Sequence, residues 1–124
     1  MSVLSDKVYD LLNDLFKYNI IVPEYYINYK GSKLFFDFYI KDLSILFEVQ
    51  GRQHSEFTKH FHKDSSGFIN SKKRDNLKLR YVEENKIPFV VVNYNERISK
   101  GLLLGKIIEA QSEVLNNDRN NNVG

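Results

Sequence analysis

The 124-residue chain contains no cysteine. This absence excludes a disulfide framework, a zinc site built from thiolates and a cysteine nucleophile. The chain also lacks any run near the roughly 18 apolar residues that a membrane-spanning helix needs, and its first residues lack the basic region and apolar stretch of a secretory signal peptide. We therefore expect a soluble, intracellular protein that works in the cytoplasm and has no membrane partner.

The chain also lacks a large excess of charge of either sign, because its formal net charge at pH 7 is only +2. Such a small excess predicts no nucleic-acid partner by itself, so the positions of the charges matter more than their sum. Hydrophobic residues make up 42% and aromatic residues 14% of the chain, a composition typical of a folded globular protein. We expect one domain over residues 1–115 and a disordered tail over residues 116–124, where no apolar period exists.

The spacing of apolar residues predicts the element order α-β-β-β-α-β-α. In residues 5–17 apolar side chains recur three and four apart, the spacing of an amphipathic helix, and Ser5 is a suitable N-cap. β-branched and aromatic residues favour strands, while helical spacing predicts two further helices. The remaining predicted ranges are strands at 25–29, 34–40, 44–50 and 87–94 and helices at 68–85 and 99–115. The predicted fold class is therefore α/β, a mixed four-stranded sheet flanked by helices.

Two carboxylates, Asp37 and Glu48, lie in hydrophobic strand sequence where no structural need for them is evident. Residues 34–50 read as a hairpin, and strand side chains alternate between the two faces of a sheet. If the faces of the two strands coincide, both acids converge on one point. Buried charges are costly unless they are paired or bound to metal, so this convergence predicts a divalent cation held by oxygen ligands.

The element order, an Asp on the second strand and Glu-x-Gln on the third together resemble the PD-(D/E)xK nuclease superfamily. The resemblance covers about residues 5–96 and is greatest to small very-short-patch-repair-like and phage (homing-type) endonucleases. The matching segments are Phe36-Asp37-Phe38, Glu48 to His54, Arg74 to Lys78 and Pro88 to Tyr94. The resemblance implies a restriction-endonuclease-like αβββαβ core followed by one extra C-terminal helix.

The chemistry of phosphodiester cleavage agrees with this resemblance. Hydrolysis needs an activated water, neutralisation of charge on the phosphate and help for the leaving oxygen, and Mg²⁺ held by two carboxylates can assist all three. We expect Asp37 and Glu48 to bind Mg²⁺, for which Mn²⁺ can substitute, with the backbone carbonyl of Val49 as a third ligand. Gln50 stands where the superfamily usually has lysine, and an amide can position water or substrate but carries no charge.

The resemblance assigns further roles. It places His54 in the active site as a general base or a ligand of water or phosphate. It also matches Asp75 to the last acid of the motif, although an ordinary ion pair with Arg74 on the helix surface is an alternative. The long helix could supply the missing positive charge. The residues that we expect to contact nucleic acid are Arg52, Lys72, Lys73 and Lys78.

The leading prediction is a Mg²⁺-dependent DNA endonuclease with Asp37, Glu48, Gln50, His54 and Asp75 as catalytic residues. With so little chain, its specificity has to come from a homodimer, a partner subunit or the shape of the DNA, and RNA stays open as a substrate. The alternative is a nuclease fold without catalysis that serves as a nucleic-acid-binding or assembly module, which the Gln50 replacement motivates. The resemblance implies a phage or mobile-element origin.

Overall fold

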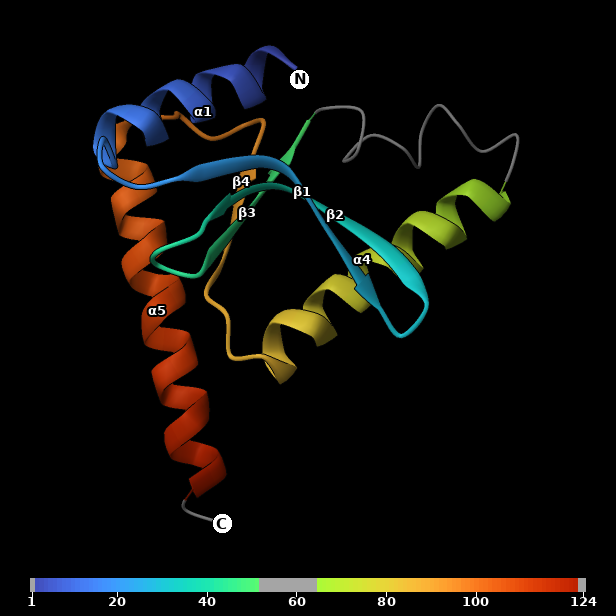
Figure 1. Ribbon diagram of the computed structural model, residues 1–124. Helices are drawn as coiled ribbons and strands as arrows, with labels where there is room; N and C mark the ends of the chain where they lie inside the picture. Colours follow the sequence, from blue (N-terminus) through green and yellow to red (C-terminus); the bar gives the residue numbers. More distant parts are fainter. Residues whose placement is uncertain (1, 52–64, 123–124) are drawn as a thin grey trace.

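The computed structural model describes residues 2–51 and 65–122, with backbone alone for residues 65–71 and 119–122. Its elements follow the order α-β-β-β-α-β-α that the sequence predicts. The helices and strands are α1 (Val3–Leu15), β1 (Ile21–Tyr29), β2 (Ser32–Ile40), β3 (Ile45–Gln50), α4 (Ser65–Glu84), β4 (Phe89–Asn93) and α5 (Lys100–Asn122). Figure 1 shows α1 and α5 together at one end of the sheet and α4 beside the β1–β2 hairpin.

The four strands form one mixed sheet in the order β1-β2-β3-β4. The pairs β1–β2 and β2–β3 are antiparallel, and β3–β4 is parallel. A parallel pair needs a crossover between its strands, and α4 belongs to that crossover. The predicted α/β class with a mixed four-stranded sheet and flanking helices is therefore confirmed.

The β1–β2 hairpin closes through Lys30 and Gly31, where the sequence predicts a turn. Both residues have positive φ angles, 52° and 82°, as a two-residue type I′ turn requires. The Gly31 N–H also donates to the Asn28 side chain at 3.1 Å. Glycine adopts this conformation without strain, which explains why it occupies the second position of the turn.

Strand β2 changes its packing partners at Asp37. Phe36 belongs to a buried cluster with Tyr29, Leu46 and Val82, whereas the larger cluster around α1 and α5 contains Phe38. The β1–β2 ladder runs through Pro23–Phe38 and Tyr25–Phe36, so Glu24 lies opposite Asp37, and Glu24 has a φ of 50°. A left-handed residue inside a strand costs about 1–2 kcal/mol and marks a local bend. Asp37 therefore lies where the hairpin passes from one core to the other. Strands β1 and β2 are visibly curved in Figure 1.

Helix α1 begins earlier than the sequence predicts, because Ser2 and not Ser5 is its N-cap. The Ser2 side chain accepts a hydrogen bond from the Ser5 N–H at 3.1 Å. Ser5 itself is buried within the helix at 7% exposure. Both serines are suitable N-cap residues. Capping by Ser2 lengthens the helix at its N-terminus, and Val8 and Leu12 are fully buried in it.

The prediction of a disordered tail over residues 116–124 differs from the structure, in which α5 continues to Asn122. An ion pair between Lys86 and Asp118, at 2.6 Å, joins this last part of α5 to the loop that follows α4. Tertiary contact of this kind supports a helix that the asparagine-rich sequence does not favour alone. Helix α4 likewise begins at Ser65, ahead of the predicted start at residue 68.

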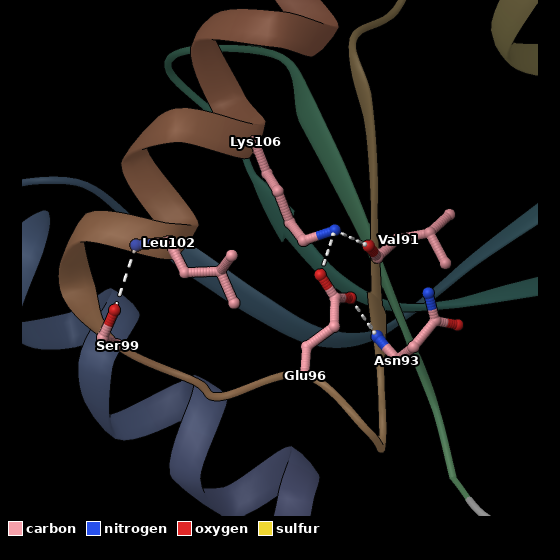
Figure 2. A network of polar contacts seen from close by, with 6 residues as sticks. All are labelled: Val91, Asn93, Glu96, Ser99, Leu102 and Lys106. Atoms are coloured by element: carbon pink, nitrogen blue, oxygen red, sulfur yellow. Dashed lines mark hydrogen bonds and ion pairs between the residues drawn. The ribbon is translucent and has the colours of Figure 1, made fainter.

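A polar network fixes the exit of edge strand β4 (Figure 2). Lys106 on α5 donates to the Val91 carbonyl at 2.9 Å and pairs with Glu96 at 2.9 Å. Glu96 in turn accepts from the Asn93 N–H at 2.8 Å. Burial acts to raise the pKa of Glu96, but the bonds from Lys106 and Asn93 outweigh it, so the pKa is lowered. The network satisfies polar groups that an edge strand otherwise leaves unpaired.

Replacing Glu96 with Gln should lower the free energy of unfolding by about 1 kcal/mol, since a charge-assisted bond becomes a neutral one. The matched control is Glu84→Gln, which breaks a surface pair with Lys30 whose side chains are 65% and 50% exposed. That control should change stability much less, because exposed ion pairs contribute little. Urea denaturation at pH 7 measures both, and equal losses would contradict a special role for the network.

Within the described residues, no helix combines the length and the apolar character needed to cross a membrane.

Candidate active site

The two strand acids that the sequence singles out lie together. The β2–β3 ladder pairs Phe38 with Phe47, Tyr39 with Leu46 and Ile40 with Ile45, so Asp37 and Glu48 occupy the next position of the same register. Their side chains hydrogen-bond to each other, and this bond contributes to the pKa of Glu48. The structure thus confirms the predicted convergence of the two carboxyl groups. Their catalytic and metal-binding roles stay predictions.

The site lies where the sheet divides. Strand β3 leaves β2 after Phe47 but continues beside β4 as far as Gln50, which pairs with Asn93. The Asp37 Oδ2 accepts the Val49 N–H at 2.6 Å, in place of the backbone partner that β2 no longer provides. A backbone N–H of this kind needs an acceptor, and the carboxylate supplies one. Asp37 therefore stabilises the point where β3 separates from β2. It also holds Val49, whose carbonyl is the predicted third ligand, at the site.

Glu48 carries an unusual proton affinity. Its side chain is only 15% exposed. Burial, the hydrogen bond to Asp37 and the charge of Asp37 raise its pKa to about 8, against the opposite effect of Lys78. Two carboxyl groups in contact resist full ionisation, so the pair retains one proton near neutral pH.

Lys78 of α4 forms an ion pair with Glu48 and is itself only 15% exposed. Its ammonium group also lies 5.3 Å from the centre of the buried Phe36 ring. Lys78 comes one helical turn before Val82, which is 5% exposed in the core, so the face of α4 that packs on the sheet also carries the lysine. The long helix thus brings a positive charge to the carboxyl pair, where Gln50 cannot.

These groups surround a pocket of about 470 Å³. It receives residues from β2, β3 and α4. Six of them are predicted from the sequence as catalytic, metal-binding or nucleic-acid-contacting residues, namely Asp37, Glu48, Val49, Gln50, Asp75 and Lys78. The lining residues are Lys33, Leu34, Phe35, Asp37, Glu48, Val49, Gln50, Arg74, Asp75 and Lys78. The pocket is large enough for a phosphate group with part of its nucleoside.

Not every predicted residue lies at this pocket. Lys72 and Lys73 are exposed on α4 and are not among the lining residues. His54 and Arg52 lie outside the described residues, so their roles stay predictions.

Four lining residues, Lys33, Leu34, Phe35 and Arg74, were not predicted for the site. Spacing along the sequence could have indicated three of the four. Lys33 and Phe35 alternate with Asp37 along β2, and Arg74 lies four residues before Lys78 on α4.

The donor set suits a hard cation with few protein ligands. Among the described residues, no group of three or more His, Cys, Asp or Glu side chains is placed to hold a metal ion. Mg²⁺ typically takes one or two carboxylates and completes its shell with water and substrate phosphate. Asp37 and Glu48 would provide those two carboxylates, and a bound cation would displace the proton that the pair retains.

Two viral proteins are similar to part of the chain. It is 34% identical over 71 residues to uncharacterized protein 307L of Invertebrate iridescent virus 6, and 30% identical over 69 residues to uncharacterized protein 033L of Invertebrate iridescent virus 3. These matches cover 57% and 56% of this chain but only 36% of either relative. No family model matches the chain, and no solved structure matches it. The chain thus shares a segment with two longer proteins of invertebrate iridescent viruses.

Proposed function

We propose that the protein is a metal-dependent endonuclease that hydrolyses phosphodiester bonds in DNA. One observation carries the proposal. Asp37 from β2, Glu48 from β3 and Lys78 from α4 meet at a single pocket, although Lys78 is 30 residues from Glu48 in the sequence. Partly buried groups of opposite charge, one of them a carboxyl group with a strongly raised pKa, are typical of catalytic sites when they line such a pocket.

Each group has a distinct task in the proposed reaction. Asp37 and Glu48 would hold Mg²⁺ or Mn²⁺, which supplies charge neutralisation and water activation. The Lys78 ammonium group stabilises negative charge that develops on the phosphate. Gln50 orients water or substrate through its amide, and Asp75 completes the wall of the pocket beside Arg74.

The proposal also accounts for the departure from the PD-(D/E)xK pattern. Gln50 replaces the lysine of the third strand, and Lys78 supplies a lysine to the same glutamate from the neighbouring helix. A charge acts through its position in space and not through its place in the sequence. Specificity would then depend on a homodimer or partner subunit. The similarity to iridescent-virus proteins supports a viral origin, but it does not point to a phage in particular.

The second candidate is a nucleic-acid-binding or assembly module without catalysis. The ion pair between Lys78 and Glu48 favours this candidate. The lysine already neutralises the Glu48 carboxylate, which would otherwise be a ligand for a metal ion. Thermal denaturation with added Mn²⁺ separates the two candidates. An enzyme gains stability from the bound cation, whereas an inert module gains none.

A cleavage screen tests the proposed function. Supercoiled, mismatched, branched and single-stranded DNA, with one RNA strand for comparison, would be incubated with the protein in Mn²⁺ and in EDTA. The proposal predicts metal-dependent strand cleavage of at least one DNA substrate. If every DNA stays intact while the protein still binds it, the binding module replaces the enzyme.

Replacing Lys78 with Ala should reduce metal-dependent cleavage by about 100-fold, because the phosphate loses its nearest buried cation. Lys72→Ala and Lys73→Ala are matched controls on the same helix, since both side chains are exposed. They should change the rate by less than about threefold, though each can weaken DNA binding at higher salt. Single-turnover rates at saturating protein measure the effect, and equal losses for all three lysines would contradict a special role for Lys78.

A further inference from the structure

Two aromatic rings remain exposed on the β1–β2 hairpin. Tyr26 and Phe35 face each other across the ladder, with ring centres 5.2 Å apart and an interplanar angle of 47°. Tyr26 is 45% exposed and Phe35 is 55% exposed. A cross-strand aromatic pair stabilises a hairpin, but that role alone does not require the rings to adjoin a polar pocket.

Phe35 lines the same pocket as the carboxyl pair. Lys33, Phe35 and Asp37 all line this pocket from β2, so a cation, an aromatic ring and an acid lie at one site. Lys33 is exposed and also lines the pocket. The pocket therefore offers a phosphate contact, a flat apolar surface and the proposed cleavage centre together.

Nucleobases present flat aromatic faces that stack on such rings whatever the base. In a duplex both faces of each base are covered by its neighbours, so only an unpaired or extruded base can lie on Phe35. We propose that Phe35, supported by Tyr26, is a stacking platform for an unpaired nucleotide next to the bond that is cut. The inference rests on the proposed function and specifies its substrate as nucleic acid with a single-stranded stretch.

Binding in EDTA tests the platform without cleavage. A fluorescently labelled 12-nucleotide DNA strand, the same strand as RNA, and the corresponding DNA duplex would be titrated with wild-type protein and variants, with anisotropy as the readout. Phe35→Leu keeps apolar bulk but removes the ring, and Phe35→Tyr keeps the ring. Tyr18→Ala removes a ring that is 97% exposed between α1 and β1 and serves as the control.

Loss of one stacked base should weaken single-strand binding by Phe35→Leu about 5- to 150-fold, because stacking contributes about 1–3 kcal/mol per base. Phe35→Tyr and Tyr18→Ala should stay near wild type, and the duplex should bind more weakly and depend less on Phe35. A 2-aminopurine in the strand should be quenched by wild type but less by Phe35→Leu. The DNA and RNA strands show which sugar the site accepts.

Unchanged single-strand affinity and unchanged quenching in Phe35→Leu overturn the platform, as does an equal loss of duplex affinity. Thermal denaturation checks that the variant is folded. If Phe35→Leu fails to fold, Phe35→Thr takes its place, because a β-branched side chain suits an exposed strand position and also lacks the ring. Phe35-dependent binding without cleavage of any DNA overturns the proposed nuclease alone. Cleavage with Phe35-independent binding overturns the platform alone.

Discussion

Asp37→Asn and Glu48→Gln should each reduce Mn²⁺-dependent strand cleavage by at least about 1,000-fold. Each replacement keeps the shape of the side chain but removes one of the two carboxyl groups that are proposed to hold the metal ion. Both variants should still fold, because Asp37 is half-buried and Glu48 lies at the pocket wall, so neither side chain fills the apolar core. The loss should therefore appear in the single-turnover rate and in the Mn²⁺ requirement, while the variants still unfold cooperatively.

The matched control is Asp14→Asn. Asp14 forms an ion pair with Lys100, as Glu48 does with Lys78, but its side chain is 47% exposed on α1. Cleavage by this variant should stay within about twofold of wild type, because exposed pairs contribute little. Undiminished cleavage by both Asp37→Asn and Glu48→Gln would contradict the site, and an equal loss in Asp14→Asn would point to a general loss of folded protein.

The metal-free protein should lose stability, relative to Glu48→Gln, as pH rises from about 4.5 to about 8. The pKa of Glu48 is higher in the folded state than in the unfolded state, so folding takes up a proton in this window. The folded state therefore binds more protons than the unfolded state, and the free energy of unfolding falls with pH. The stability contribution is complete below pH 4.5 and is lost as pH passes through 8. The difference between the proteins should reach several kcal/mol.

Mn²⁺ should reverse this loss. A cation displaces the proton of the pair, so apparent Mn²⁺ affinity should rise about tenfold per pH unit up to pH 8 and then level off. Denaturant unfolding at five pH values, with and without Mn²⁺, measures both effects in wild type and Glu48→Gln. Asp14→Asn is a control with the opposite pH dependence. The hydrogen bond and the charge of Lys100 lower the pKa of Asp14, so the stability contribution of Asp14 is lost as pH falls and not as it rises. Parallel pH profiles for wild type and Glu48→Gln would contradict the raised pKa.

The sequence was sufficient to predict the order of elements and the acid pair, and the reasons are physical. Strand alternation and a short turn fix which side chains of a hairpin face each other, so the pattern alone could place Asp37 and Glu48 together. The β-branched run at residues 87–94 indicates a buried strand, as β4 confirms.

The role of Lys78 could not be chosen from the sequence alone. Three lysines of the long helix were candidates, and only the packing of α4 through Val82 and Phe36 shows which one faces Glu48. The extent of α5 depended on distant contact as well, because Lys86 pairs with Asp118 across the chain. Local helix and strand propensities do not predict such long-range contacts.

The bend at Asp37 was also absent from the sequence pattern. Alternation predicts that Phe36 and Phe38 share one face, yet they belong to separate buried clusters. The positive φ of Glu24, opposite Asp37, marks where the hairpin departs from regular geometry. Departures of this kind concentrate at functional sites.

Anomalous diffraction from a crystal soaked in Mn²⁺ tests the central claim, that Asp37 and Glu48 jointly hold the catalytic cation, most directly. We expect an anomalous peak between the two carboxyl groups, in contact with both, and no such peak in crystals of Glu48→Gln. A crystal at saturating Mn²⁺ with no peak there, and with the ion pair between Glu48 and Lys78 intact, would contradict it.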